Sequence, residues 1–364
     1  MRAILIATVF LLGAGAAVAQ SLQTSAGRVA LTQMMAGLDE PWAIGFLPDG
    51  SYLITQRDGE LLYVKDGSAR KVAGVPRVVA SGQGGLLDVM IPRDFTQSRE
   101  VFLSYSKRLT GGAGTAMAVG KLSSDGRRLS KVRDLFQMSQ GSSGGRHFGS
   151  RIVEARDGTL FMTLGERGNR PAAQDLTLHH GSVIRINRDG SIPADNPFVS
   201  RPGARPEIYS FGHRNPQGAA LDAKGVLWTA EHGAKGGDEV NRIRKGANYG
   251  WPIISYGVHY SGAKIGQGTA RVGLKQPAHY WDPSIAPSGL MIYSGKLWPK
   301  WRGNLFVGSL KLDYISRLAG SALSEVEQLK RPETERVRDI VEAPDGSIWF
   351  ISVGKGAIYR MTPM

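Results

Sequence analysis

A turn that ends in glycine, followed at once by a short apolar run, occurs four times along this chain. The four segments read DGSYLIT at 49–55, DGTLFMT at 157–163, KGVLWT at 224–229 and DGSIWFI at 345–351. An Asp-Gly pair before a β-rich run is a strong hairpin signal, because glycine accepts the positive φ that a tight turn demands. The pattern predicts a chain of short antiparallel strands.

The spacing of these turns predicts the architecture. Gly50, Gly158, Gly225 and Gly346 are separated by 108, 67 and 121 residues, near two, one and two units of about 50 to 60 residues, a little above the kelch-type period. Five intervals imply six units. We therefore predict an all-β fold, a six-bladed β-propeller with four-stranded antiparallel blades. The alternative is that such hairpins recur by chance in a β-rich protein.

The composition excludes several classes of site. The 364 residues contain no cysteine, which excludes disulfides, thiolate metal sites, iron–sulfur clusters and cysteine nucleophiles. Lys and Arg number 45 against 31 Asp and Glu, a net charge of +14, which favours acidic partners, a small polyanionic ligand or anionic surfaces; a solvated basic exterior is the alternative. A nucleic-acid binder would show a basic patch interleaved with aromatic residues. The sequence shows none, so we expect no nucleic-acid partner.

The first residues have the layout of an export signal. An apolar run covers 3–18, and the small residues Ala17 and Ala19 close it. The run is short for a membrane span and fits a signal-peptidase site; an uncleaved anchor is the alternative. We expect residues 1–19 to be a cleaved signal peptide and residues 20–364 to form a single β-propeller domain. The mature protein would be periplasmic, with no stable membrane insertion, as a monomer or homodimer.

Two glycine-rich segments carry candidate chemistry. The segment GGRHFGSR at 144–151 places His147 among glycines and arginines. A histidine suits proton abstraction near neutral pH, and adjacent cations favour its unprotonated form; a structural histidine is the alternative. The segment GHRNPQG at 212–218 carries Arg214 and Asn215, which could polarise a carbonyl or bind a carboxylate, unless Arg214 only holds a loop.

A third cluster is cationic. Arg336 and Arg338 alternate at strand period, so both should point to one face, and Lys311 supplies a possible third positive group. Cations on one strand face require an anion or solvent. We favour an anionic ligand over the alternative, a solvated edge strand.

Oxygen ligands are concentrated in one region. The segments EHGAKGGDE at 231–239 and NYGWP at 248–252 combine carboxylates with glycines, and calcium favours carboxylate and backbone carbonyl oxygens. The EF-hand spacing is missing. His232 beside Glu231 leaves a transition metal as the alternative.

These segments follow one another as in a known family. From about Leu38 to the C-terminus the chain resembles the soluble PQQ-dependent aldose sugar dehydrogenases of the glucose/sorbosone dehydrogenase family. The matching motifs are EPWAI at 40–44, GQGGLLD at 82–88, RHFG at 146–149, GHRNPQG at 212–218, EHG at 231–233, GGDE at 236–239, NYGWP at 248–252 and DPSIAPSG at 282–289. So many matches in order are highly specific. The family fold is a six-bladed propeller, in agreement with the glycine spacing.

The resemblance implies PQQ, a flat quinone with three carboxylates, as the cofactor. In this scheme Arg336 and Arg338 pair with its carboxylates, and Arg214 with Asn215 holds its reactive carbonyl oxygen. The implied cofactor contacts are Gln83, Arg214, Asn215, Tyr260, Lys311, Arg336 and Arg338.

The resemblance also implies calcium. One ion would bind the backbone carbonyls of Gly233 and Ala234 and sit on the quinone. A second, structural ion would use Glu239 and the region of Tyr249.

The implied reaction is oxidation of an aldose at its anomeric carbon. His147 takes the proton of the anomeric hydroxyl while hydride moves to the quinone, and Arg214 and calcium stabilise the negative charge that grows on the quinone oxygen. The product is a lactone, and electrons pass to an external acceptor that the sequence does not identify. Arg167 stands where glucose-specific relatives use another polar residue, which points to a broader range of aldoses.

Two other functions remain open at this stage. A calcium-dependent lactonase or esterase on a six-bladed propeller would need carboxylate and amide ligands around a central calcium, whereas this chain supplies cations. A non-enzymatic ligand-binding propeller would give His147 and the pair Arg336 and Arg338 no reason to face one channel.

Overall fold

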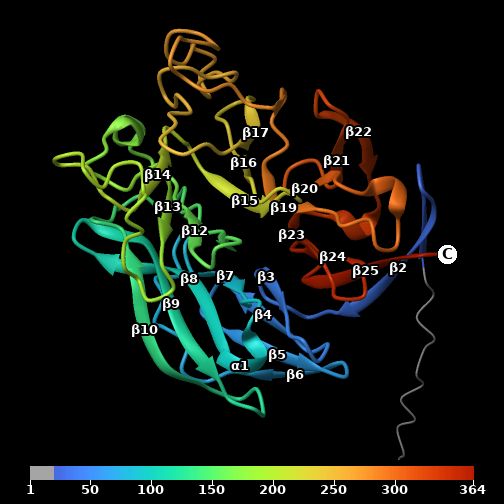
Figure 1. The fold of residues 1–364 in the computed structure, drawn as a ribbon. Helices are drawn as coiled ribbons and strands as arrows, with labels where there is room; N and C mark the ends of the chain where they lie inside the picture. Colours follow the sequence, from blue (N-terminus) through green and yellow to red (C-terminus); the bar gives the residue numbers. More distant parts are fainter. Residues whose placement is uncertain (1–19) are drawn as a thin grey trace, which may run out of the picture.

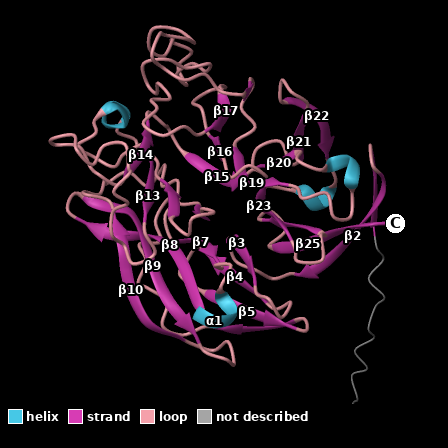
Figure 2. Ribbon diagram, viewed as in Figure 1, coloured by secondary structure: helices cyan, strands magenta, loops and turns pink. Residues whose placement is uncertain are grey.

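Six antiparallel sheets are arranged radially around a common centre in the computed structural model, which describes residues 20–364 (Figure 1). The predicted signal peptide lies outside the described residues. Strands dominate the described chain, and its helices are few and short (Figure 2). The predicted six-bladed β-propeller is therefore confirmed.

The sheets, called blades 1 to 6, follow the order of the chain. Blade 1 contains β3 (Pro41–Phe46), β4 (Tyr52–Gln56), β5 (Leu61–Lys65) and β6 (Ser68–Lys71). Blade 2 contains β7 (Leu86–Met90), β8 (Glu100–Leu109), β9 (Gly112–Leu122) and β10 (Leu129–Gln137). Blade 3 contains β11 (Ile152–Glu154), β12 (Leu160–Thr163), β13 (Ser182–Ile186) and β14 (Ile208–Phe211). Blade 4 contains β15 (Pro216–Leu221), β16 (Leu227–Glu231), β17 (Asp238–Arg242) and β18 (His279–Trp281).

The last two blades complete the ring. Blade 5 contains β19 (Pro287–Ile292), β20 (Leu305–Ser309), β21 (Ile315–Ala319) and β22 (Ser324–Leu329). Blade 6 contains β23 (Val337–Glu342), β24 (Ile348–Ser352), β25 (Ala357–Pro363), β2 (Gly27–Met35) and β1 (Gln20–Thr24). The helical segments are α1 (Phe95–Ser98) and the 3₁₀ turns η1 (Arg170–Gln174), η2 (Pro299–Trp301) and η3 (Pro332–Thr334).

Blade 6 joins the two ends of the described chain. Strand β2 pairs antiparallel with β25, for example Leu31 with Met361, and β1 adds a fifth strand outside β2. Hydrogen bonds between β2 and β25 thus close the ring and cover the strand edge that β25 would otherwise expose.

The glycine-ended turns occupy equivalent positions in four blades. Each joins the first and second strands of its blade, and Gly50, Gly158, Gly225 and Gly346 have φ between 81° and 88°. They lie in blades 1, 3, 4 and 6, which accounts for separations of two, one and two units. Blades 2 and 5 replace the turn with longer connections that contain α1 and η2, so they carry no such signal.

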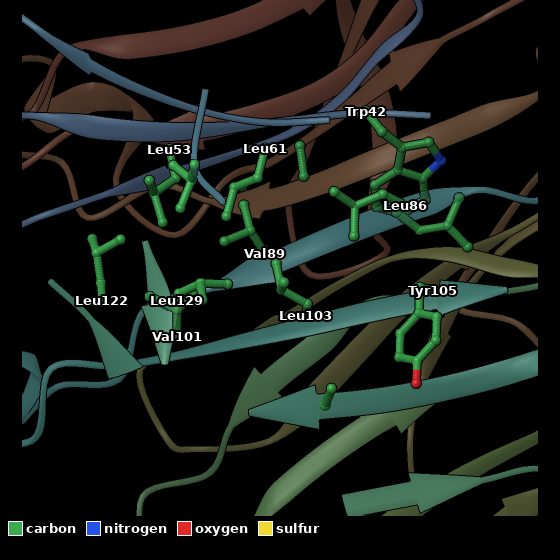
Figure 3. Close-up of a cluster of buried hydrophobic side chains, with 14 of the residues drawn as sticks. Trp42, Leu53, Leu61, Leu86, Val89, Val101, Leu103, Tyr105, Leu122 and Leu129 are labelled. Atoms are coloured by element: carbon green, nitrogen blue, oxygen red, sulfur yellow. The ribbon is translucent and has the colours of Figure 1, made fainter. Parts of the chain in front are cut away.

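Hydrophobic side chains fill the space between neighbouring blades. Between blades 1 and 2, for example, Trp42, Leu53 and Leu61 face Leu86 and Leu103 (Figure 3). Corresponding clusters lie at each of the other five blade interfaces. Inner strands such as β4 and β20 are buried on both faces and read as continuous apolar runs, whereas the outer strand β6 is exposed and β22 alternates in burial.

A buried ion network joins the inner strands near the centre. The Arg151 guanidinium pairs with Asp88 of β7 at 2.7 Å and with Asp339 of β23 at 3.0 Å. The second oxygen of Asp88 accepts the Ile152 N–H at 2.7 Å, and that of Asp339 accepts the Ile44 N–H at 3.0 Å. The network therefore connects blades 1, 2, 3 and 6 through groups that are fully or almost fully buried.

Within residues 20–364, none of the helices has the length and apolar character needed to cross a bilayer.

Replacing Arg151 tests the central network. Arg151→Met leaves two neighbouring buried carboxylates without their cation, so the free energy of unfolding should fall by about 3–5 kcal/mol. Arg360→Met, which removes a more exposed ion pair with Asp345, should cost at most about 1 kcal/mol. Urea unfolding of both variants measures the difference; equal small losses would show that the network does not hold the ring together.

Candidate active site

A cavity of about 530 Å³ opens among loops from several blades. Its lining residues are Gln83, Gln217, His232, Ala286, Leu310, Lys311, Asp313, Glu335, Arg336 and Arg338. They come from blades 2, 4, 5 and 6 or the loops beside them. Radial sheets bring their loops together at one end of the ring, so residues far apart in the chain share this cavity.

One wall of the cavity is cationic. Lys311, Arg336 and Arg338 all line it. Arg336 precedes β23 and has a φ of 51°, so its place on this wall does not follow from the predicted strand alternation. Arg336 donates to the Leu310 carbonyl at 3.0 Å, and Arg338 donates to Gln217 Oε1 at 2.7 Å. Neither of these contacts neutralises a guanidinium.

Arg338 is the most constrained of these cations. Burial lowers the pKa of its guanidinium to about 9, and the positive charges of Arg336 and Arg151 add to that effect. A buried cation short of negative charge is costly. An anion in the cavity would offset this cost, so the wall suits an anionic ligand better than solvent.

His147 is held in one orientation at the same end of the ring. Its backbone N–H donates to Gln83 Oε1 at 2.7 Å, and its φ of 59° lies in the left-handed region. Its Nδ1 lies 2.7 Å from Glu166 Oε1. Because the Glu166 carboxylate can only accept a hydrogen bond here, the neutral ring carries its hydrogen on Nδ1 and leaves Nε2 as an acceptor.

Burial controls the charge of this histidine. Burial lowers the pKa of His147 below 6.5, with smaller lowering effects from Arg214 and Arg146, while Glu166 acts to raise it. The ring is therefore neutral at neutral pH. A neutral imidazole with a free Nε2 and a carboxylate behind it has the equipment of a general base.

Arg214 and Asn215 lie at the start of β15. The Arg214 N–H donates to Glu231 at 2.8 Å, and its guanidinium donates to the His232 carbonyl at 3.3 Å. Asn215 Oδ1 accepts the Gly149 N–H at 3.1 Å, which links it to the loop of the histidine.

His232 lies between the cationic wall and the base. Its pKa is lowered to about 3 by burial and then by the charges of Arg214, Arg338 and His147. It also lines the cavity. Within residues 20–364 no three His, Asp or Glu side chains are grouped as metal ligands here, so the transition-metal alternative gains no support.

Several buried polar atoms here have no hydrogen-bond partner among the described residues. They are Glu166 Oε2, Arg214 Nε, Asn215 Nδ2, His232 Nε2 and Trp251 Nε1. Buried polar atoms are normally paired. Such a concentration of unpaired donors and acceptors around one base is typical of a site that binds a polar ligand.

The residues proposed for calcium lie beside the cavity rather than in its lining. The Gly233 N–H donates to Asp238 Oδ1 at 2.7 Å, and Ala234 is buried. A Cβ at position 233 would lie 2.3 Å from the carbonyl oxygens of Gly236 and Gly237. Glycine therefore permits carbonyl groups to converge at this position, as a hard cation requires.

Glu239 and Tyr249 have different environments. Glu239 is partly buried, and desolvation together with the negative charge of Glu231 raises its pKa. The Tyr249 hydroxyl donates to the Arg242 carbonyl at 2.6 Å and accepts the Arg244 N–H at 2.9 Å. It therefore already makes two hydrogen bonds with the backbone. Among residues 20–364, no group of three or more His, Asp or Glu side chains is arranged to hold a metal.

The last candidate, Tyr260, lies on the long connection between β17 and β18, drawn in orange at the top of Figure 1. Its side chain is 72% exposed. It is close enough to influence the pKa of Arg214, and it does not line the cavity that contains the cationic wall.

Two contributions were missed by sequence reasoning. Glu166, which orients His147, lies in a Gly-Glu-Arg-Gly turn. A carboxylate in a glycine-rich turn could have been identified from the sequence as a candidate site residue. Arg167 was interpreted as bearing on substrate range, yet it is 1% exposed and packs 3.3 Å from the Phe148 ring centroid. It donates to the carbonyls of Gly144 and Arg146, so it shapes the loop that carries His147.

Comparison with known proteins identifies close relatives. Residues 38–360 match the family described as Glucose / Sorbosone dehydrogenase. The chain is 42% identical over 336 residues to the aldose sugar dehydrogenase YliI of Escherichia coli (strain K12), covering 90% of this chain and 91% of that protein. It is 31% identical over 316 residues to quinoprotein glucose dehydrogenase B of Acinetobacter calcoaceticus, covering 77% and 64%.

Solved structures of sugar dehydrogenases share the fold of this chain. The apo-form of the soluble aldose sugar dehydrogenase from Escherichia coli has a TM-score of 0.89 at 41% identity and covers 92% of this chain and 100% of that one. The PQQ-bound form of the aldose sugar dehydrogenase from Streptomyces coelicolor shares the fold, with a TM-score of 0.77 at 24% identity, covering 92% and 97%.

The contact between His147 and Glu166 has a measurable consequence. The carboxylate stabilises the imidazolium, so Glu166→Gln should lower the pKa of His147 further below 6.5. Glu207→Gln, which removes a carboxylate bonded to His179 instead, should leave His147 unchanged. Imidazole NMR across a pH titration measures both, and an unchanged or raised pKa in Glu166→Gln would contradict the assigned contact.

Proposed function

Because this chain belongs to the glucose/sorbosone dehydrogenase family, we propose that it oxidises aldose sugars at the anomeric carbon to lactones, with PQQ and calcium as cofactors. The observation that carries the proposal is the position of Gln83. Its side chain lines the cationic cavity and also accepts the backbone N–H of His147. The anion site and the base are therefore parts of one site.

The residues present suit PQQ. A ligand with three carboxylates would match Lys311, Arg336 and Arg338, and the unpaired donors of Arg214 and Asn215 would suit its carbonyl oxygen. When bound, PQQ would supply a quinone that accepts a hydride, and calcium bound near Gly233 and Ala234 would polarise that quinone.

The chain's own residues perform the proton chemistry. His147 Nε2 accepts the proton of the anomeric hydroxyl, and Glu166 stabilises the imidazolium that results. Arg214 lies beside this pair and stabilises negative charge that develops during the reaction. The buried surroundings limit competing access of water. Electrons then pass to an external acceptor of unidentified nature.

We also propose that residues 1–19 are a signal peptide and that the mature domain, residues 20–364, works in the periplasm. The small residues Ala17 and Ala19 support cleavage after position 19. N-terminal sequencing of the exported protein should begin at Gln20; a start at Met1 would contradict it.

Reconstitution tests the activity. The purified protein with PQQ and calcium should reduce a redox dye with several aldoses, and omission of either addition should abolish the reaction. His147→Ala should lower kcat by about 10²–10⁴-fold, the usual contribution of a general base. His279→Ala, on the outer strand β18, is the matched control and should retain activity. Tight PQQ binding without oxidation of any aldose would instead favour a ligand-binding propeller.

Glu239 tests the structural calcium. In metal-free protein the raised pKa of Glu239 means that stability falls as pH rises above 4.5, the ordinary value. Glu239→Gln should therefore raise the melting temperature of the metal-free protein at pH 8 but remove the gain that calcium gives the wild type, about 2.7 kcal/mol at one hundred times the dissociation constant. Glu60→Gln, which disrupts a surface ion pair, should keep that gain. A calcium gain that persists in Glu239→Gln would exclude this carboxylate as a ligand.

A further inference from the structure

Two further arginines, which are not part of the cationic wall, lie near His147 and Arg214. Arg146 directly precedes His147 and lowers its pKa, and Arg170 lies close enough to lower the pKa of Arg214. Neither Arg146 nor Arg170 lines the cavity that contains Lys311, Arg336 and Arg338. Neither has a carboxylate within 4.0 Å in the part of the chain that the structure describes.

Arg170 is held in place with part of its guanidinium unused. Its Nη1 donates to His259 Nδ1 at 2.7 Å, and its Cζ lies 5.5 Å from the Trp251 ring centroid. The same ring lies 5.3 Å from Cζ of Arg214. A guanidinium has five N–H donors in a planar fork, and only Nη1 of Arg170 has a partner among residues 20–364. The free edge through Nε and Nη2 has the geometry that binds a carboxylate in two hydrogen bonds.

Arg146 is also anchored beside the base. A Cβ at Gly168 would lie 2.8 Å from Arg146 Nε, so the guanidinium rests on the turn that carries Glu166 and Arg167. The side chain is exposed. It therefore keeps its donors available to a molecule that approaches His147.

This charge opposes the reaction of a neutral sugar. His147 must gain a proton while Arg146 and Arg214 already lower its pKa, and like charges disfavour the imidazolium. Glu166 offsets part of this repulsion, and a neutral aldose, which brings only hydroxyl groups, adds nothing to that compensation. A substrate with its own negative charge would relieve the repulsion.

Resting on the proposed function, we propose that the preferred substrates are aldoses that carry a carboxylate, namely aldohexuronic acids, free or as the reducing unit of an oligosaccharide. Their carboxylate is attached to C5, which is joined to the anomeric carbon through the ring oxygen. One molecule could thus present its anomeric hydroxyl to His147 and its carboxylate to Arg170 or Arg146. Arg170 and Arg146 are then specificity-determining residues.

The reaction balances without further reagents. The anomeric C–H bond breaks and its electron pair leaves as a hydride to the quinone cofactor, while the hydroxyl proton passes to His147 Nε2. The carbon and oxygen form the C=O bond of a lactone. The carboxylate is not consumed, and the product is the lactone of an aldaric acid.

Paired sugars give the test. Enzyme reconstituted with PQQ and calcium is assayed with D-glucuronate against D-glucose and D-galacturonate against D-galactose. The wild type should favour each uronate by about tenfold in kcat/KM at low salt, in line with a charge-assisted hydrogen bond. High salt should reduce that ratio, because screening weakens the attraction.

Variants separate the two arginines from general charge effects. Arg170→Gln and Arg146→Gln should each lower the uronate-to-aldose ratio about tenfold, and kcat/KM for the neutral sugar should not fall, because a charge that disfavours the imidazolium is removed. Arg242→Gln removes a positive charge at the far end of β17 and should keep the wild-type ratio. If loss of the His259 contact destabilises the Arg170→Gln protein, Arg146→Gln alone tests the inference.

The same design has a readout that does not depend on turnover of a uronate. Methyl β-D-glucuronide, which lacks a free anomeric hydroxyl, should inhibit glucose oxidation more strongly than methyl β-D-glucoside, and both arginine variants should remove the difference. Oxidation of neutral aldoses with no preference for uronates would overturn this inference and leave the proposed function standing. Oxidation of neither kind of sugar would overturn both.

Discussion

Arg151 and the two carboxylates that hold it, Asp88 and Asp339, are the contact on which the remainder of the site depends. The guanidinium neutralises two buried acids, and each acid also accepts an N–H group from a neighbouring blade. Separate blades are otherwise joined mainly by hydrophobic contact, which is not directional. The ion network adds direction, because its hydrogen bonds are satisfied at one relative placement of the inner strands.

The ion network around Arg151 also positions the functional groups. Arg338 is next to Asp339 in β23, and Arg151 follows the loop of His147 by a few residues. Arg151 Nε also donates to the carbonyl of Gln217, whose side chain accepts from Arg338. The cationic wall and the base are thus built on the same central contacts, although their residues are nearly 200 positions apart in the chain.

Much of the fold was predictable because its turns obey a local rule. The Asp-Gly pairs at Gly50 and Gly346 predict a positive φ, and the spacing of such turns along the chain predicts the number of blades. The turns of blades 2 and 5 were not predictable in this way, since longer connections with α1 and η2 have no fixed residue requirement. The pairing of β2 with β25 was also not predicted, because a contact between distant segments of the chain leaves no local sequence pattern.

The candidate site shows the same division. His147, Arg214, Arg336 and Arg338 were identifiable because cations and a histidine in glycine-rich turns are unusual, and the motif resemblance to the family is confirmed by the comparisons. The role of Arg167 depends on its packing against Phe148, which no sequence pattern reveals. The pairing of Glu166 with His147 was not predicted either, because the two residues are 19 positions apart and only the fold brings them together.

One flat anionic cofactor should touch both the cationic wall and the base. A crystal structure of the protein soaked with PQQ and calcium tests this claim most directly. We predict density for the cofactor with its carboxylates against Lys311, Arg336 and Arg338 and its opposite edge toward Arg214 and His147. Cofactor bound elsewhere, or bound to the wall with His147 out of reach, would contradict it.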